Sequence, residues 1–328
     1  MSLSSAPSAP SASTLPYQPL VGSSSQHSPV RGLAYHWRSW GQAQPGQAPL
    51  FLLHGWMDVG ASWQLLVDAL AQTGFTGLII APDWRGFGHT ASSQDSFYFP
   101  DYLGDLDALI PQVLAQFAYA TDTTVDIVGH SMGAHAALLY AAARPQRLRR
   151  LVNIEGFGAP PAPASAAPAR YTQWLNELQA LRAGKLVLAG YDSQEAVARR
   201  LMKTNPRIAP AYAQWLAGHW AVPDVSERGQ GRWQILGAAA HKISNPVLFR
   251  AEEVQACYAA ITCPVLTLLA EENRLHEWQD GQYSLADYLQ RLSHLADNRC
   301  ITIADAGHML HHDQPQALAR AIAAFLRP

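Results

Sequence analysis

The sequence is poor in charged residues, in cysteine and in long apolar runs. Asp, Glu, Lys and Arg make up 15% of its 328 residues, whereas soluble proteins usually carry about a quarter. The formal net charge is −2, so the chain lacks the basic surplus that binds nucleic acid or an anionic membrane. No apolar run reaches the length of about 18 residues that a transmembrane helix needs. We therefore expect neither nucleic acid nor a membrane as a partner.

Cysteine is nearly absent. Cys257, Cys263 and Cys300 are odd in number and lack the spacing of metal ligands, so no disulfide framework is expected. The N-terminus shows no basic segment followed by an apolar run, which is the pattern of a secretory signal. These features favour a soluble, cytoplasmic protein. We expect no cofactor and no metal.

Composition divides the chain into four parts. Residues 1–28 are Ser, Ala and Pro in low-complexity order, and we expect a disordered tail because they cannot bury enough surface to fold. Residues 29–158 and 261–328 carry short apolar runs that alternate with helix-like stretches. Residues 159–260 break this alternation.

The alternation favours a mostly parallel β-sheet covered by helices on both faces, which is an α/β fold. The apolar runs lie at residues 33–37, 50–53, 78–81, 125–128, 151–154, 265–269 and 300–303. The helix-like stretches lie at residues 61–73, 100–119, 132–144, 282–296 and 313–326. In such sheets the chemistry gathers beyond the carboxyl ends of the strands. Polar residues follow these ends at His54, Asp83, Ser131, Glu155, Glu271, Glu272 and His308.

Residues 159–260 are too many for a loop between two strands of one sheet. They open with four prolines and continue in amphipathic helix-like stretches. We expect a helical cap over the strand ends, in which some tryptophans line a pocket and the others join the cap to the core. The tryptophans of this segment are Trp174, Trp215, Trp220 and Trp233.

The most informative motif is Gly-His-Ser-Met-Gly at residues 129–133. A β-branched, apolar run precedes it and an alanine-rich helical stretch follows it. A serine between such a strand and helix sits on a sharp turn with its hydroxyl above the sheet edge, and the two glycines avoid collisions there. Ser131 is therefore predicted to be a nucleophile.

A serine hydroxyl needs a base to take its proton and donors to stabilise the oxyanion. His308 is the candidate base, because it follows the last strand in a loop with a glycine before it. Its neighbours His311 and His312 are expected to be solvated or to cap the final helix. Met132, at the helix N-terminus, offers one backbone N–H to the oxyanion, and the turn at residues 54–58 should offer the other.

With these motifs the chain resembles the α/β-hydrolase superfamily, from about residue 30 to the C-terminus. The resemblance rests on motifs that occur in order, namely His-Gly-Trp at 54–56, Pro-Asp-Trp-Arg-Gly-Phe-Gly at 82–88, the serine motif and Gly307-His308. Within the superfamily the chain is similar to the serine-hydrolase-like and meta-cleavage-hydrolase-like group with a helical cap. The resemblance implies Trp56 and Met132 as oxyanion-hole donors and Asp83 and Arg85 as loop-organising residues.

The acid of the triad departs from the pattern of this superfamily. Many members place an Asp after the seventh strand, where this chain has Asn273, with Glu271 and Glu272 out of register. A subgroup of the similar haloalkane dehalogenases uses a glutamate at the end of the sixth strand, and that position falls on Glu155. A lone carboxylate that ends an apolar strand needs a partner, and His308 would be one. The alternative for Glu155 is a bond to a cap arginine or to a backbone turn.

We therefore expect a cofactor-free serine hydrolase with a Ser131–His308–Glu155 triad. It would cleave a small to medium carboxylic ester with an apolar or aromatic part through an acyl-enzyme. Two alternatives remain, a carbon–carbon bond hydrolase of a ring-cleavage diketone and a non-catalytic hydrolase homologue that binds a small molecule. Dehalogenation and epoxide hydrolysis are disfavoured because those relatives need an Asp in place of Ser131.

Overall fold

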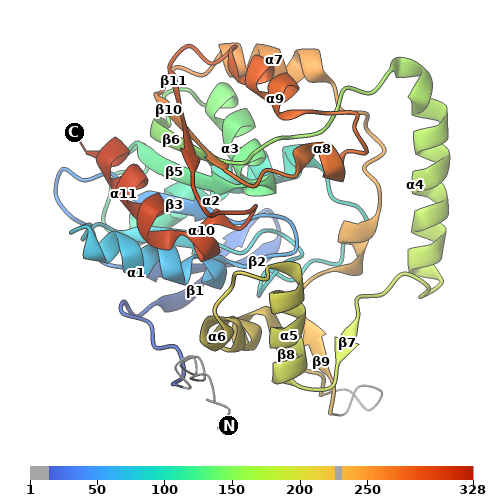
Figure 1. Cartoon of the computed structure of the whole chain (residues 1–328), viewed down its shortest axis with the longest axis horizontal. Helices are drawn as coiled ribbons and strands as arrows, with labels where there is room; N and C mark the ends of the chain where they lie inside the picture. Colours follow the sequence, from blue (N-terminus) through green and yellow to red (C-terminus); the bar gives the residue numbers. More distant parts are fainter. Residues whose placement is uncertain (1–14, 226–230, 328) are drawn as a thin grey trace, which may run out of the picture.

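An eight-stranded β-sheet runs through the centre of the protein, in a computed structural model that describes residues 15–225 and 231–327 (Figure 1). Its strands follow the order β1-β2-β4-β3-β5-β6-β10-β11. β2 pairs antiparallel with β1 and with β4, and the pairs from β4 through β11 are parallel. The strands are β1 (Ser24–Val30), β2 (Leu33–Trp40), β3 (Leu50–Leu53), β4 (Ile79–Pro82), β5 (Val125–His130), β6 (Leu148–Ile154), β10 (Val265–Ala270) and β11 (Asn298–Ile303).

The central strands are mostly apolar, and both of their faces are covered by helices. Every residue of β3, β4, β5 and β10 is buried. Helices α1 (Gln64–Gln72), α10 (Leu310–Asp313) and α11 (Pro315–Leu326) lie together on one face of the sheet. Helices α2 (Phe99–Gln116), α3 (Met132–Ala143), α7 (Ala251–Ala259) and α9 (Leu285–Leu292) cover the other face. The predicted α/β class, a mostly parallel sheet between two helical layers, is confirmed.

The predicted tail is wrong for residues 15–28. β1 begins at Ser24 and pairs with β2 over seven residues. Upstream of it, the Val21 N–H donates to Asp68 Oδ1 at 3.0 Å, and the Tyr17 hydroxyl also bonds to Asp68. A backbone ladder satisfies N–H and C=O groups whatever side chains a strand carries, so a Ser-rich composition did not prevent order here. Residues 1–14 lie outside the described residues.

The chain between β6 and β10 adds a layer of its own. This segment contains α4 (Ala167–Arg182), α5 (Gln194–Thr204), α6 (Pro210–Trp220) and a small sheet of β7 (Gly190–Tyr191), β8 (Ala221–Pro223) and β9 (Trp233–Ile235). Short 3₁₀ turns lie at Gly60–Trp63, Ala164–Ala166 and Ala239–Lys242, and the small helix α8 spans Leu275–Trp278. α4 stands at the edge of the molecule, while α5 and α6 pack on each other (Figure 1).

The predicted cap boundary at residue 260 is wrong by about one helix. α7 packs on α3 and α9, and its Val254 and Tyr258 belong to the apolar core of that sheet face. The inserted segment therefore ends before Ala251.

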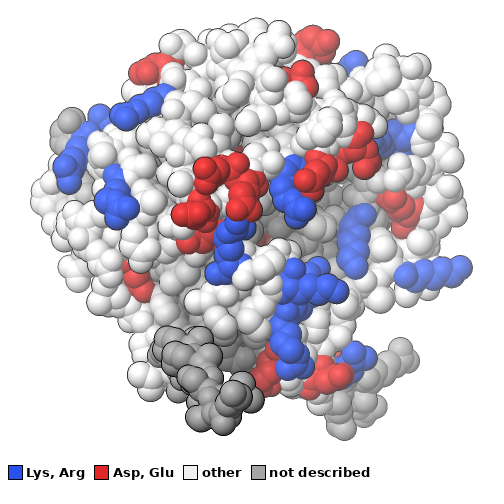
Figure 2. Space-filling model, in the orientation of Figure 1, with Lys and Arg blue, Asp and Glu red and all other residues white. Residues whose placement is uncertain are grey.

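The surface agrees with the low charge content of the sequence. On the face shown in Figure 2, basic and acidic side chains are intermixed, and no extended patch of one sign is present. Among the described residues, no helix combines the length and the apolar character that crossing a membrane requires.

Candidate active site

Ser131 occupies the sharp turn between β5 and α3. Its backbone has φ 52° and ψ −117°, a strained conformation for a residue with a side chain. The flanking glycines make the turn possible, because a Cβ on Gly129 would lie 2.5 Å from Ala134 Cα. A Cβ on Gly133 would lie 2.3 Å from the carbonyl oxygen of Leu53. The turn thus presses the start of α3 against the end of β3.

Glu155 lies beside His308. The distance from His308 Nδ1 to Glu155 Oε2 is 2.7 Å, and Glu155 is only 1% exposed at the carboxyl end of β6. Its other oxygen, Oε1, accepts the backbone N–H of Ala270 at 2.9 Å and the side-chain amide of Asn273 at 3.1 Å. These three donors satisfy a carboxylate that would otherwise be costly to bury.

The two neighbouring glutamates point elsewhere. Glu271 Oε2 accepts the backbone N–H of Asp305 at 3.0 Å, and Glu272 forms an ion pair with Arg207. Both glutamates are exposed. Asn273, at the position where the resemblance leads one to expect an acid, instead donates to Glu155.

Ser131, Met132, Glu155 and His308 line one cavity of about 250 Å³. In the described part of the chain, Ser131 Oγ and His308 form no hydrogen bond, and such bonds often tighten only when substrate binds. Apolar and aromatic side chains form most of the remaining wall. These are Phe99, Phe157, Phe249, Leu275 and Trp278.

A larger cleft of about 1370 Å³ adjoins this cavity. The two spaces share several side chains, among them Phe99, His135, Phe249 and Trp278. The proline-rich stretch at the start of the insert lines the far side of the cleft, together with α7 and Arg170 of α4. A bound molecule can therefore extend from Ser131 toward the inserted segment.

The expectation that cap tryptophans line the pocket is wrong. None of the four belongs to the wall of either cavity. Trp174 Nε1 donates to Ser96 Oγ at 3.1 Å, and Trp220 Nε1 donates to the carbonyl of Met57 at 3.0 Å. Trp215 packs on Tyr17 and Tyr212, and Trp233 is half-buried in the same apolar cluster. All four therefore join the insert to the core.

Trp278, which the sequence analysis missed, takes the place expected of a cap tryptophan. Its ring meets the ring of His308 edge-on at 4.7 Å, and 46% of its surface is exposed. It lines both the cavity and the cleft, and it belongs to α8, a single helical turn that follows β10 in the chain. Its exposure and its contact with His308 would have identified it as a pocket residue, but both are visible only in the folded structure.

The turn after β3 lies against Ser131. A Cβ on Gly55 would lie 3.3 Å from Ser131 Cβ, so the backbone of this turn passes beside the candidate nucleophile. Trp56 is not part of the cavity wall, and its indole N–H donates to the carbonyl of His241 at 3.1 Å. His54 Nε2 accepts the backbone N–H of Trp84 at 3.0 Å, a structural role in this turn.

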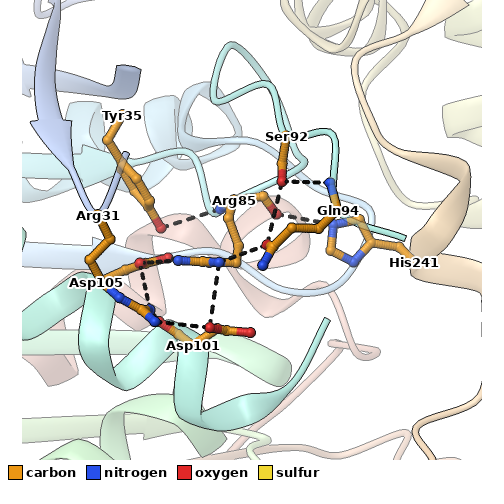
Figure 3. A network of polar contacts seen from close by, with 8 residues as sticks. All are labelled: Arg31, Tyr35, Arg85, Ser92, Gln94, Asp101, Asp105 and His241. Atoms are coloured by element: carbon orange, nitrogen blue, oxygen red, sulfur yellow. Dashed lines mark hydrogen bonds and ion pairs between the residues drawn. The ribbon is translucent and has the colours of Figure 1, made fainter. Parts of the chain in front are cut away.

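Asp83 and Arg85 organise loops and stay out of the cavity wall. Asp83 accepts backbone N–H groups of Gly60 at 2.6 Å and His89 at 2.8 Å. Arg85 lies at the centre of the network in Figure 3, where it binds Asp105 through two nitrogens and Gln94 at 2.7 Å. Its carbonyl also bonds to His241 Nε2 at 3.1 Å, which ties the inserted segment to the core.

His311 and His312 were expected to be solvated or to cap the final helix, but both are buried. His311 packs against the ring of His130, with 4.7 Å between the ring centroids. Burial also lowers the pKa of His130 well below its ordinary value. The interior behind the turn that carries Ser131 is thus rich in histidine.

Comparisons with known proteins agree with this architecture. The model of the alpha/beta hydrolase family matches residues 50–321. The chain belongs to this family. The resemblance inferred from the sequence motifs is therefore confirmed.

Individual relatives are distant. A serine hydrolase-like protein of Dictyostelium discoideum is 24% identical over 88% of this chain and 77% of its own length. The 2-hydroxymuconate semialdehyde hydrolase of a Pseudomonas species is 35% identical, but over only 34% of this chain and 37% of its own length. The thioesterase domain from the curacin biosynthetic pathway superimposes with a TM-score of 0.75, at 21% identity over 92% of this chain and 99% of that domain. The last likeness shows a common fold.

Proposed function

We propose that this α/β hydrolase is a serine hydrolase that cleaves a small to medium carboxylic ester. Ser131 is the nucleophile, His308 the general base and Glu155 the acid that orients His308. The observation that carries the proposal is the 2.7 Å contact between His308 Nδ1 and Glu155 Oε2 on the wall of the cavity that Ser131 lines.

The residues act in two half-reactions. Ser131 Oγ attacks the ester carbonyl carbon while His308 Nε2 takes the hydroxyl proton. The tetrahedral intermediate collapses, and His308 gives this proton to the oxygen of the leaving alcohol. A water molecule then attacks the acyl-enzyme while His308 takes one of its protons. The second intermediate collapses, His308 returns this proton to Ser131 Oγ, and the carboxylic acid is released.

Glu155 and two backbone amides stabilise the charges that develop in these steps. The carboxylate of Glu155 holds the proton on Nδ1 of His308, so the lone pair of Nε2 is available for the Ser131 proton. Met132 is the first residue of α3, so its N–H has no acceptor within the helix and is available to the oxyanion. We assign the second oxyanion donor to the N–H of Trp56, one residue after the Gly55 backbone that passes Ser131.

The size and lining of the site favour an ester with an apolar or aromatic part. The cavity of about 250 Å³ is below the usual range of ligand pockets, about 300–1,000 Å³. It accommodates one short group beside Ser131, and the adjoining cleft receives the remainder of the substrate. The proline-rich stretch at the start of the insert and Arg170 of α4 border this cleft.

A carbon–carbon bond hydrolase of a ring-cleavage diketone is the second candidate. The partial similarity to 2-hydroxymuconate semialdehyde hydrolase favours it. The same Ser-His-acid arrangement serves both reactions, so the choice of substrate has to be measured.

A substrate panel tests the proposal, with p-nitrophenyl esters of increasing acyl length, lactones and ring-cleavage diketones. We expect ester hydrolysis that Ser131→Ala lowers in kcat by roughly 10⁴ or more, because the covalent route is lost. Wild-type turnover in a correctly folded Ser131→Ala variant would end the serine-hydrolase assignment. Labelling by a fluorophosphonate separates an enzyme from a non-catalytic homologue, whose serine should not react.

A further inference from the structure

A second group of possible ligand side chains lies buried behind the turn between β5 and α3 that carries Ser131. Asp58, His130 and His311 each offer one ligand atom, and these atoms all lie within 4.8 Å of one another. The three residues are 7%, 2% and 1% exposed. They come from the turn after β3, the last position of β5 and helix α10. The mechanism proposed above uses none of them.

The hydrogen bond of His130 determines which of its nitrogens is free. Nε2 lies 2.8 Å from the carbonyl oxygen of His308, and a carbonyl only accepts, so Nε2 carries the proton and donates. In a neutral ring the lone pair is then at Nδ1. This Nδ1 is buried and has no hydrogen-bond partner in the described part of the chain. A Cβ on Gly55 would lie 3.0 Å from it, so glycine there leaves this nitrogen uncovered.

Asp58 presents a second buried lone pair. Its Oδ1 accepts the N–H of Val59 at 2.9 Å, but Oδ2 has no hydrogen-bond partner among the residues that the structure describes. His311 Nε2 is 3.8 Å from Oδ2, too far for a hydrogen bond. Buried acceptors without a donor are unfavourable. A cation bound between them removes this cost.

We propose that Asp58, His130 and His311 bind a divalent transition-metal cation of the zinc class. Two imidazole nitrogens and one carboxylate oxygen form a donor set that such ions take, whereas Mg²⁺ and Ca²⁺ prefer oxygen ligands alone. Ligand atoms on a tetrahedral zinc ion are about 3.3 Å apart, so the side chains need to move by about an ångström or less. The bond from His130 Nε2 to the His308 carbonyl fixes the orientation of the ring and leaves Nδ1 free to bind the ion.

The proposed site adjoins the candidate active site. The rings of His130 and His308 lie 4.6 Å apart. Metal binding at these three side chains does not rest on the proposed function.

The test uses the full chain, stripped of metal with a chelator. Co²⁺ is titrated by its visible absorption and Zn²⁺ by calorimetry, in the wild type and in Asp58→Asn and His311→Gln. We expect one equivalent to bind to the wild type, and each variant to weaken binding by about a hundredfold or more. His294→Gln, at an exposed histidine, is the matched control and should bind as the wild type does. Circular dichroism in metal-free buffer verifies that the variants are folded.

Crystals soaked in Zn²⁺ provide a measurement that needs no variant. An anomalous peak between the three side chains supports the site, and a water molecule there without such a peak overturns it. Absence of stoichiometric binding, or binding that Asp58→Asn and His311→Gln leave unchanged, overturns it too. If the protein binds one equivalent but hydrolyses no ester at any metal level, the proposed function fails and the metal site stands.

Discussion

Replacing Glu155 by glutamine removes one negative charge from the partner of His308 and preserves the size of the side chain. A glutamine amide has one oxygen and one NH₂ group, so it cannot serve all three donors that the two oxygens of Glu155 accept. Two of these donors, from Ala270 and Asn273, meet at Oε1. An NH₂ group turned toward them would leave buried donors unpaired, at about 1–3 kcal/mol each. We therefore expect the amide oxygen to face Ala270 and Asn273, and the NH₂ group to face His308.

This orientation reverses the tautomer of His308. Its Nδ1 then accepts from the amide, and the proton moves to Nε2, the nitrogen that has to take the proton of Ser131. The variant also lacks the carboxylate that stabilises the imidazolium. Together these effects should lower kcat by on the order of 10²–10⁴, which is a barrier increase of about 3–5 kcal/mol.

The assay is kcat for a p-nitrophenyl ester, measured for Glu155→Gln, Glu271→Gln and Glu272→Gln. The last two are matched controls, since their carboxylates contact the Asp305 amide and Arg207, and kcat should change by less than about tenfold. Thermal unfolding checks that all three variants are folded. Wild-type kcat in Glu155→Gln, or a larger loss in one of the controls, would refute the assignment of the acid.

Two further predictions follow from the cavity wall and from a buried loop carboxylate. Trp278→Ala should change the ratio of kcat/KM between short and long acyl esters, by an amount that corresponds to about 1–3 kcal/mol of discrimination. Trp174→Ala, outside the cavity wall, should leave this ratio unchanged. Equal ratios in both variants would exclude Trp278 from substrate selection. Burial raises the pKa of Asp83, but the hydrogen bond and charge of His36 outweigh it and bring the pKa down to about 2, below the unfolded value of 3.8. Asp83 should thus stabilise the fold by roughly 2 kcal/mol above pH 4, an advantage lost as the pH falls through about 2. In urea unfolding, the free energy of unfolding of Asp83→Asn should be lower than that of the wild type by this amount at pH 7, and the two should approach each other near pH 2. A difference that stays constant with pH would show that the carboxylate charge of Asp83 is not its cause.

The strand ends were predictable from the sequence because the constraints there are local. A nucleophile turn needs small residues at fixed positions, and Gly129 and Gly133 leave no room for a Cβ in the structure. Glu155 was recognisable because a carboxylate at the end of a buried strand needs a partner. Its bond to His308 joins residues that are 153 positions apart in the sequence. The geometry of this bond could therefore be known only from the folded structure.

The misses share a different cause. β1 is held by a backbone ladder to β2, and composition carries no information on such a ladder. The tryptophans of the insert and Trp278 are indistinguishable by residue type, and only the path of the chain after β10 brings Trp278 to His308. His311 is buried, and its ring packs against that of His130 at the end of β5. The polar stretch His-His-Asp, taken alone, could not show this contact.

The order of the strands is compatible with the acid that we propose. β6 and β10 are parallel neighbours in register, with Ile154 opposite Leu268, so their carboxyl ends open at the same point of the sheet edge. A carboxylate from either strand end can reach a histidine that hangs from the loop after β11. In this chain Asn273, from the end of β10, donates to Glu155 Oε1, the carboxylate that we propose as the acid. Under this proposal the asparagine at position 273 does not abolish the triad, since the neighbouring strand supplies the charge and the amide of Asn273 holds it.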